Sequence, residues 1–193
     1  NTVVSFLTHT NILSLITKIF YPGMKLIVSE RCDPWERSLP IRVITKYLYP
    51  LADGIVCQSE VVSEFFPKYS RNKIRVIKNP INVESISNRN FTEKRKAIIS
   101  VGRLFEQKNF ALLIDSFNDI KDEFPEHILE IYGEGHLREQ LQNQIKNLGL
   151  VNRVFLKGVK NNVMKFVSDS EIFVMSSNYE GFPNALIEAM ASG

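Results

Sequence analysis

Two short stretches of this chain place charged side chains and glycine at spacings that could bind a ligand. The first, residues 102–109, reads Gly-Arg-Leu-Phe-Glu-Gln-Lys-Asn and follows an apolar run. It presents two cations, Arg103 and Lys108, before Asn109, a residue type that often caps a helix. A lysine at a helix N-terminus faces the positive end of the helix dipole, and a bound anion removes that conflict. Taken alone, two solvent-exposed cations on a loop would be the simpler interpretation.

The second stretch, residues 180–188, reads Glu-Gly-Phe-Pro-Asn-Ala-Leu-Ile-Glu and supplies two carboxylates. Asn184 and Glu188 are four residues apart in the expected helix, and the tilt of the Cβ atoms leans Glu188 toward the helix start. A capping box would need its carboxylate at Ile187, so helix capping explains Glu188 poorly. Glu180 lies in the loop before this helix, where ligands of parallel sheets commonly bind.

Together, the two stretches could bind opposite ends of one ligand. The cations would hold a nucleotide diphosphate at one end, and the carboxylates would hold a sugar at the other. Neither stretch is persuasive alone, so it is their pairing that decides the interpretation.

Other ligand motifs fit less well. Residues 132–135, Tyr-Gly-Glu-Gly, also stand between a strand and a helix, but a dinucleotide-binding fingerprint needs a third small residue where the chain has Arg138. No Gly-Lys-Ser/Thr motif of the phosphate-binding loop type occurs. We therefore expect no dinucleotide cofactor, and a tight turn under a ligand pocket is what remains for this motif.

A metal site is not expected either. His9, His127 and His136 are isolated in the sequence, and no Asp-x-Asp pair is present to hold a divalent ion on a nucleotide. The charge of a leaving diphosphate would then be neutralised by Arg103, Lys108 and backbone N–H groups.

Strands and helices alternate along the chain, which favours a doubly wound α/β fold. Expected strands, most of them nearly continuously apolar as covered parallel strands must be, are Val3–Leu7, Lys25–Ser29, Gly54–Gln58, Ile74–Ile77, Ala97–Val101, Ile128–Tyr132, Val154–Leu156 and Ile172–Met175. Expected helices are Asn11–Phe20, Leu39–Leu51, Glu60–Phe66, Phe110–Phe124, Leu137–Leu148, Val163–Val167 and Asn184–Ala191.

A polar segment divides this pattern into two domains. Residues 81–96 read as a linker between a first domain, residues 1–80, and a second domain, residues 97–193. The chain has no initiator Met, begins in a strand and ends in a helix without a following strand. We therefore expect a piece of a longer protein in which both domains are incomplete.

Composition and charge indicate a soluble globular protein with an anionic partner. The chain has 193 residues, of which 44% are hydrophobic and 23% charged. Residues 1–96 carry 15 Lys/Arg and 8 Asp/Glu, whereas residues 97–193 carry 9 and 13. The basic half suggests a membrane surface or a phosphorylated acceptor, and a merely solvated basic surface explains it about as well. Two cysteines without a secretory signal indicate a reducing compartment.

In this order, residues 99–110 (Ile-Ser-Val-Gly-Arg-Leu-Phe-Glu-Gln-Lys-Asn-Phe), 131–135, 154–158 and 177–193 resemble the retaining GT-B-fold glycosyltransferases called "glycosyl transferases group 1". Residues 4–12 and 28–34 are similar to bacterial members that build surface glycans, such as lipopolysaccharide or capsule, on lipid carriers. The resemblance covers essentially the whole chain and is most specific in the second half.

The resemblance implies that residues 1–80 belong to an acceptor-side domain and residues 97–193 to a donor-binding domain. It also implies a role for each candidate residue. Arg103 and Lys108 would bind the donor diphosphate, Glu188 the ribose, and Glu180, as the catalytic residue, the transferred sugar. Backbone or side-chain contacts to the donor phosphate or sugar would come from Gly181, Phe182 and Asn184. His9 lies near the place of an acceptor-domain histidine that contributes to catalysis in relatives, and a loop histidine without a role is the competing interpretation.

The resemblance also implies the reaction. A hexose or N-acetylhexosamine would pass from a nucleotide-diphosphate sugar, expected to be UDP-linked, to a glycan or polyprenyl-linked acceptor with retention of configuration and without a metal or cofactor. The enzyme would be cytoplasmic, on the inner face of the cytoplasmic membrane, and would not bind nucleic acid. A nucleotide-sugar epimerase of the same fold and a non-catalytic sugar-nucleotide-binding module are the alternatives, and this piece could itself be inactive.

Overall fold

The computed structural model of the chain describes residues 1–81 and 94–193. Contacts within the chain divide it into two compact units. The first unit contains Asn1–Pro80 and Tyr179–Phe182, and the second contains Ile81–Asn178 and Pro183–Gly193. Most of the expected linker falls on residues 82–93, outside the described residues. The two residues at its end, Arg95 and Lys96, lie in a strand.

The first unit is built on a four-stranded parallel sheet with the strand order β1-β2-β3-β4. Its strands are β1 (Thr2–Phe6), β2 (Lys25–Glu30), β3 (Gly54–Cys57) and β4 (Ile74–Val76). Its α-helices are α1 (Thr8–Phe20), α2 (Leu39–Leu48) and α3 (Glu60–Glu64), and its short 3-10 helices are η1 (Pro34–Glu36), η2 (Tyr49–Leu51) and η3 (Lys68–Lys73).

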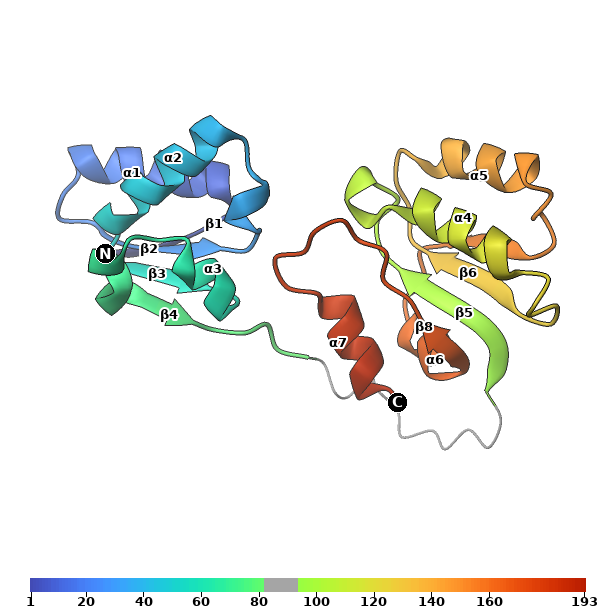
Figure 1. Cartoon of the computed structure of the whole chain (residues 1–193). Helices are drawn as coiled ribbons and strands as arrows, with labels where there is room; N and C mark the ends of the chain where they lie inside the picture. Colours follow the sequence, from blue (N-terminus) through green and yellow to red (C-terminus); the bar gives the residue numbers. More distant parts are fainter. Residues whose placement is uncertain (82–93) are drawn as a thin grey trace. The chain divides into compact units, whose positions relative to one another are not determined.

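One face of this first sheet forms the core of the unit. Alternate residues of β2 and β3, including Leu26, Val28 and Ile55, are fully buried in one cluster with Leu15 of α1 and Val62 of α3. Helices α1 and α2 lie side by side on this face (Figure 1). Each apolar side chain buried here contributes roughly 1.5–3 kcal/mol of transfer free energy.

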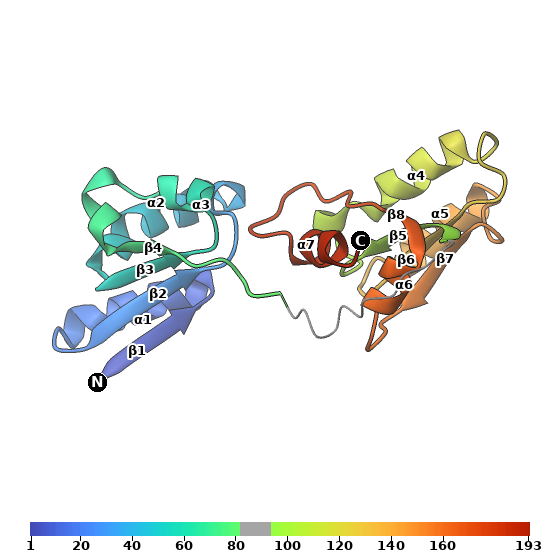
Figure 2. The ribbon, with the colours of Figure 1, turned by 90° about the horizontal axis from the view of Figure 1, so that it is seen from below.

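The second unit has a four-stranded parallel sheet with the strand order β7-β6-β5-β8 (Figure 2). Its strands are β5 (Arg95–Val101), β6 (Ile128–Tyr132), β7 (Val154–Gly158) and β8 (Ser170–Phe173). Its helices are η5 (Glu106–Lys108), α4 (Phe110–Ile120), α5 (Arg138–Asn147), α6 (Met164–Ser168) and α7 (Asn184–Ala191).

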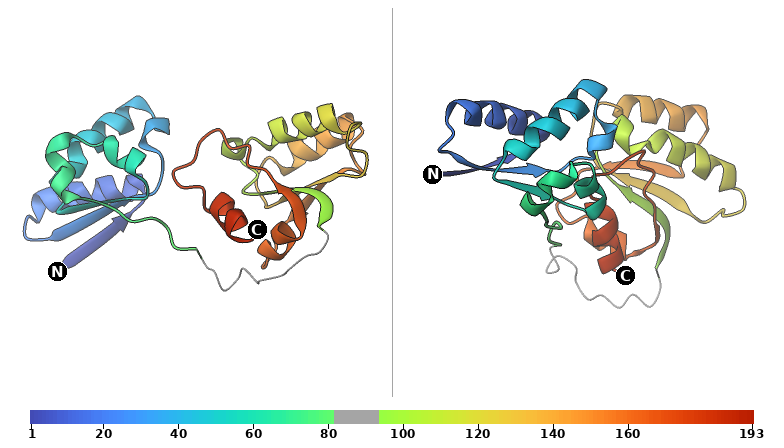
Figure 3. Two further views of the ribbon diagram at one scale, coloured as in Figure 1. Left: turned by 60° about the horizontal axis from the view of Figure 1, so that its bottom comes forward. Right: turned by 60° about the vertical axis from the view of Figure 1, so that its left-hand side comes forward.

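Helices cover both faces of this second sheet, as a doubly wound fold requires (Figure 3). On one face, Ile98, Leu129 and Ile131 pack against α4 and α5. On the opposite face, Ile99 and Tyr132 pack against α6 and α7. Successive residues of a strand point to opposite faces of the sheet. Because helices cover both faces, the side chains on both must be apolar, and these strands are therefore almost uninterrupted apolar runs.

Two of the helix ends that differ from the expected bounds have a clear structural reason. Helix α1 begins at Thr8, three residues before the expected start, because buried Thr8 and Asn11 bond to the sheet instead of to solvent. Helix α4 ends at Ile120 instead of Phe124. There the Arg153 side chain donates hydrogen bonds to the carbonyls of Phe124 and His127, which takes up acceptors beyond the helix end.

Candidate functional site

Three loops at one edge of the second sheet carry most of the candidate residues. Strand β5 pairs in parallel with β6 on one side and with β8 on the other. The loops after β5, β6 and β8 begin at Gly102, Gly133 and Val174. Parallel strands end at the same edge of a sheet, where ligands of open α/β folds bind. The topology therefore brings the cationic stretch, the Gly-Glu-Gly turn and the start of the loop that leads to Glu180 to one edge.

Glycine is required where two of these turns meet. The Gly102 N–H donates to the Tyr132 carbonyl at 2.9 Å. Gly133 has a φ of +144°, and a Cβ atom there would lie 1.9 Å from the Gly102 carbonyl oxygen. Any side chain at this position would force the turns after β5 and β6 apart. The motif at residues 132–135 is thus a packing turn beneath the candidate ligand site.

The two candidate cations extend from the turn after β5. The aliphatic part of Lys108 passes over Gly102, with its Cδ and Cε atoms 3.0 Å from where a Cβ atom would stand. Arg103 is exposed, and its guanidinium lies 4.9 Å from the centre of the Phe105 ring. Among the described residues, the Arg103 guanidinium forms no hydrogen bond or ion pair. Its five donors are therefore available to a ligand.

Asn178 joins the loop after β8 to the cationic turn. Its side chain donates to the Glu106 carbonyl at 3.0 Å, and its backbone N–H donates to the Gln107 carbonyl at 2.9 Å. Its Oδ1 atom accepts from Asn109 Nδ2 at 2.9 Å. Three hydrogen bonds from one residue thus fix two loops that are about 70 residues apart in sequence.

Neighbouring residues strengthen this connection. The Ser176 hydroxyl donates to the carbonyl of Lys108 at 2.7 Å. Asn109 caps α4 by accepting from the Leu112 N–H, as expected, and does so with a left-handed φ of 47°.

Next to Ser176, the buried Ser177 hydroxyl oxygen has no hydrogen-bond partner in the described chain. An unpartnered buried hydroxyl is uncommon and is consistent with a ligand contact.

The remaining candidates lie in the loop before α7 and in α7 itself. Glu180, Gly181 and Phe182 are half-buried, and all three belong to the first unit by their contacts. Asn184 is the exposed first residue of α7, and Glu188 is half-buried one turn later.

Helix capping does not account for the Glu188 carboxylate. Pro183 stands at the N-cap of α7 and provides no side-chain hydrogen bond. Within residues 1–81 and 94–193, the Glu188 side chain has no hydrogen bond or ion pair. The next residue, Ala189, packs α7 onto the sheet.

Two histidines that look isolated in the sequence each bond to one carboxylate. His136 Nε2 lies 2.9 Å from Glu106 Oε1, and His127 Nε2 lies 2.9 Å from Glu171 Oε2. The hydrogen bond from His136 lowers the pKa of Glu106. In the described parts of the chain, no three His, Cys, Asp or Glu side chains gather in a group that could hold a metal ion.

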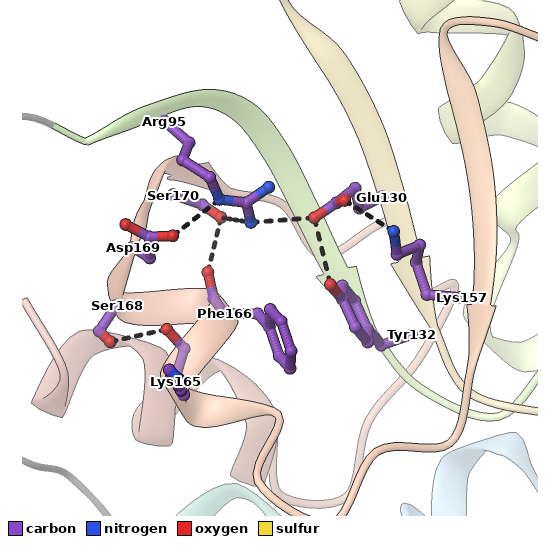
Figure 4. Close-up of polar contacts among 9 residues, drawn as sticks. All are labelled: Arg95, Glu130, Tyr132, Lys157, Lys165, Phe166, Ser168, Asp169 and Ser170. Carbon is purple, nitrogen blue, oxygen red and sulfur yellow. Dashed lines mark hydrogen bonds and ion pairs between the residues drawn. The ribbon is translucent and has the colours of Figure 1, made fainter.

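An ion-pair network joins three strands of the second sheet (Figure 4). The Glu130 carboxylate, only 3% exposed, bonds to Arg95 of β5 at 3.0 Å and to Lys157 of β7 at 3.2 Å. Tyr132 donates its hydroxyl to the same carboxylate at 3.2 Å and stacks on Phe166. Burial and Glu130 raise the pKa of Tyr132 to about 12, so the hydroxyl stays a donor. The network thus ties β5, β6 and β7 together through one carboxylate.

In the first unit, His9 is exposed in the first turn of α1, at the edge where β1 ends. It makes no hydrogen bond or ion pair with the residues that the structure describes. Ligands of open α/β folds commonly bind at this edge of the sheet.

Comparison with known proteins identifies the family. The sequence model of the family described as "Glycosyl transferases group 1" matches residues 82–193, more than half of the chain. The chain belongs to this family. No helix within residues 1–81 or 94–193 is long and apolar enough to cross a membrane.

Curated relatives of this group 1 transferase extend the similarity to its first half. A Campylobacter jejuni enzyme is 34% identical over 96% of this chain and 54% of its own length. Its name is N-acetylgalactosamine-N,N'-diacetylbacillosaminyl-diphospho-undecaprenol 4-alpha-N-acetylgalactosaminyltransferase. An uncharacterised glycosyltransferase of Methanocaldococcus jannaschii is 34% identical over 92% of this chain and 49% of its own. The chain thus spans about half the length of these relatives.

Solved structures show that the chain has the GT-B fold of glycosyltransferases. HepE of Anabaena, in complex with UDP-glucose, superposes with a TM-score of 0.80 at 18% identity, over 98% of this chain and 57% of that one. TarM superposes with a TM-score of 0.80 at 20% identity, over 99% and 39%. The expected fold class and family resemblance are confirmed.

Proposed function

We propose that this glycosyltransferase takes a hexose or N-acetylhexosamine from a UDP-sugar and transfers it, with retention of configuration, to a lipid-linked glycan in bacterial polysaccharide synthesis. The observation that carries the proposal is the convergence of the Arg103–Lys108 turn and the loop after β8, joined by Asn178, at one edge of the second sheet. The names of the relatives, which include a transferase acting on a diphospho-undecaprenol acceptor, support the acceptor class.

The diphosphate would bind at the cationic turn. Arg103 has an exposed guanidinium oriented by the Phe105 ring, and Lys108 lies against Gly102, so both sides of the turn carry positive charge. These groups and backbone N–H donors would neutralise the leaving UDP without a metal ion.

The two carboxylates would divide the rest of the donor between them. Glu188, half-buried and one turn into α7, would accept hydrogen bonds from the ribose hydroxyls. Glu180 would face the sugar carbon that becomes positive as the diphosphate leaves. The amides of Gly181 and Phe182 and the side chain of Asn184 would contact phosphate or sugar oxygens. The acceptor would bind on the first unit, where His9 lies at the edge of the sheet.

The first unit would also dock on the inner face of the cytoplasmic membrane. Residues 1–80 carry 11 Lys/Arg and 6 Asp/Glu. Exposed apolar side chains follow one face of α1 at Leu13, Ile16 and Phe20. Apolar side chains beside cations suit an interfacial surface over anionic lipid.

A donor and acceptor panel tests the proposal on the full-length protein. Purified enzyme is incubated with UDP-GalNAc, UDP-GlcNAc, UDP-glucose or UDP-galactose and with a diphospho-undecaprenol-linked glycan that ends in GalNAc. We expect sugar transfer from one donor and an α-linkage in the product. Isomerised nucleotide sugar without transfer would instead identify an epimerase. Binding of UDP without either reaction would identify a non-catalytic module.

A further inference from the structure

Glu30 is a buried carboxylate that forms no ion pair within residues 1–81 and 94–193. It is the last residue of β2 and is 1% exposed. Burying an ionised carboxylate is costly unless hydrogen bonds replace its lost hydration. The buried position of the Glu30 carboxylate therefore calls for a structural or functional explanation.

Neutral donors surround the Glu30 carboxylate. Its Oε1 atom accepts from the backbone N–H groups of Arg31 at 3.1 Å and Cys32 at 3.2 Å. The Thr8 hydroxyl lies 3.1 Å from Oε1 and 3.3 Å from Oε2. The Tyr49 hydroxyl donates to Oε2 at 2.8 Å. These bonds replace hydration with fixed dipoles.

The donors come from three segments that Glu30 holds together. Thr8 starts α1, Arg31 and Cys32 form the turn after β2, and Tyr49 starts η2. The fully buried Asn11 extends the connection by donating to the Tyr49 hydroxyl at 3.0 Å. The Glu30 carboxylate therefore fixes the first turn of α1 against the turn after β2.

Two of the segments that Glu30 fixes lie at the carboxyl ends of β1 and β2, the edge where ligands of parallel sheets commonly bind. Thr8 directly precedes His9, and the Arg31 guanidinium is oriented by a hydrogen bond to Asn79 Oδ1 at 2.9 Å. Between β1 and α1, Leu7 has a φ of 71°, a left-handed conformation that is rare for leucine. Such outliers persist only where surrounding contacts hold them, and they gather at functional sites.

We propose that Glu30 is a positioning residue of the acceptor site. It holds His9 and Arg31 in the arrangement that receives the terminal, hydroxyl-rich sugar of the lipid-linked glycan. The inference rests on the proposed function, because that function places the acceptor on the first unit. A carboxylate serves here because one group must accept from backbone, hydroxyl and phenol donors at once.

Glu30→Gln tests this role, and Asp53→Asn is its matched control. Asp53 is also a carboxylate of the first unit, but it bonds to Leu26 N–H and Lys18 at the opposite end of β2, each at 2.7 Å. In the full-length protein, we expect Glu30→Gln to raise the KM for the GalNAc-ended glycan about tenfold. The KM for the UDP-sugar and the affinity for UDP should not change. Asp53→Asn should leave both KM values unchanged. An unchanged acceptor KM in Glu30→Gln would overturn the inference.

A second measurement works without any transfer reaction. Cys32 donates its N–H to Glu30, whereas Cys57 is fully buried. Alkylation by iodoacetamide, followed by peptide mass analysis, should be several-fold faster at Cys32 in Glu30→Gln than in wild type or Asp53→Asn. Cys57 serves as the internal reference. Equal Cys32 rates in wild type and Glu30→Gln would contradict a positioning role even if the proposed reaction failed.

Tyr49→Phe covers the case in which Glu30→Gln does not fold. It removes only the hydroxyl that donates to Glu30, and its ring keeps its stacking on Phe66. The acceptor KM and the Cys32 alkylation rate should shift in the same direction as expected for Glu30→Gln, by a smaller factor. No change in either quantity would count against the proposal.

Discussion

At the scale of single residues, the two cations of the turn after β5 make the most direct prediction. Arg103→Ala or Lys108→Ala should each weaken UDP binding at least about tenfold, because a charge-assisted hydrogen bond typically contributes roughly 1.5–3 kcal/mol. Isothermal titration calorimetry with EDTA present measures this on the full-length protein. Lys121→Ala, in the same unit but beyond the end of α4, is the control and should bind UDP normally. Unchanged affinity in both site variants, or loss of wild-type binding in EDTA, would refute the assignment.

Substitutions of Glu180 and Glu188 should change different steady-state kinetic parameters. Ribose contacts are similar in the ground and transition states, so Glu188→Gln should mainly raise the KM for the donor. Charge on the sugar ring develops only as the diphosphate leaves, so Glu180→Gln should mainly lower kcat.

Melting curves provide the control for this pair. Both carboxylates could instead be structural, with Glu180 holding its loop and Glu188 its helix. Parallel losses of activity and of several degrees in Tm would then replace the kinetic separation and would contradict the assigned roles.

At the scale of elements, the loops of the second unit depend on one another. Asn178 fixes the loop after β8 to the turn that carries Lys108 through bonds to Glu106, Gln107 and Asn109. Asn178→Ala should therefore lower UDP affinity about three- to tenfold, because two side-chain hydrogen bonds are lost and the cations become less ordered. Asn143→Ala on the exposed surface of α5 is the control. Calorimetry that finds equal affinity for UDP in both variants would show that the loops hold their positions without this residue.

The ion-pair network across β5, β6 and β7 should make stability depend on pH. Burial acts to raise the pKa of Glu130, but hydrogen bonds and charges from Arg95 and Lys157 outweigh it and lower that pKa. Because the pKa of Glu130 is lower in the folded state than in the unfolded state, its ionisation stabilises the fold. This stabilisation is complete above the pKa of the unfolded state, about 4.3, and is lost as the pH falls through the pKa of the folded state.

Thermal melts of wild type and Glu130→Gln measure this contribution. At pH 7 the variant should be less stable by about 1–3 kcal/mol, because two partly buried cations lose their carboxylate partner. The difference should shrink as pH falls from about 4.3 downward. Glu171→Gln should have a much smaller effect, because this exposed carboxylate pairs with His127 and Lys96 where solvent screens the charges. If the free energies of unfolding of wild type and Glu130→Gln differ by a constant amount from pH 7 to pH 3, the ionisation of Glu130 does not account for the difference.

At the scale of the whole molecule, the first unit should bring the enzyme to anionic membranes. Arg42 and Lys46 are one turn apart on α2, next to the exposed side chains of Val43 and Tyr47. Reversing both charges to Glu should reduce co-sedimentation with vesicles that contain phosphatidylglycerol, since each cation contributes about 1 kcal/mol near such a surface. Lys146→Glu with Lys165→Glu in the second unit is the control. Equal wild-type binding to neutral and anionic vesicles would refute the docking.

The sequence determined the alternation of strands and helices, because burial on one or both faces imposes apolar periodicity on each element. The bounds of β6 and α7 agree with those expected, and the other elements differ by a few residues at their ends. Candidate residues that follow strands, such as Arg103, could be found because a ligand edge is a property of strand direction, which is readable from the element order.

Only the tertiary structure decided which side chains meet. Asn178 and Glu106, Glu30 and Tyr49, and His136 and Glu106 are each 19 or more residues apart. Their hydrogen bonds depend on strand register and on turn geometry, such as the approach of Gly133 to Gly102. Polar residues carry no local periodicity that would mark their partners. The sequence could therefore predict which edge of the sheet carries the candidate residues, whereas the hydrogen bonds that hold these residues form only when distant strands lie side by side.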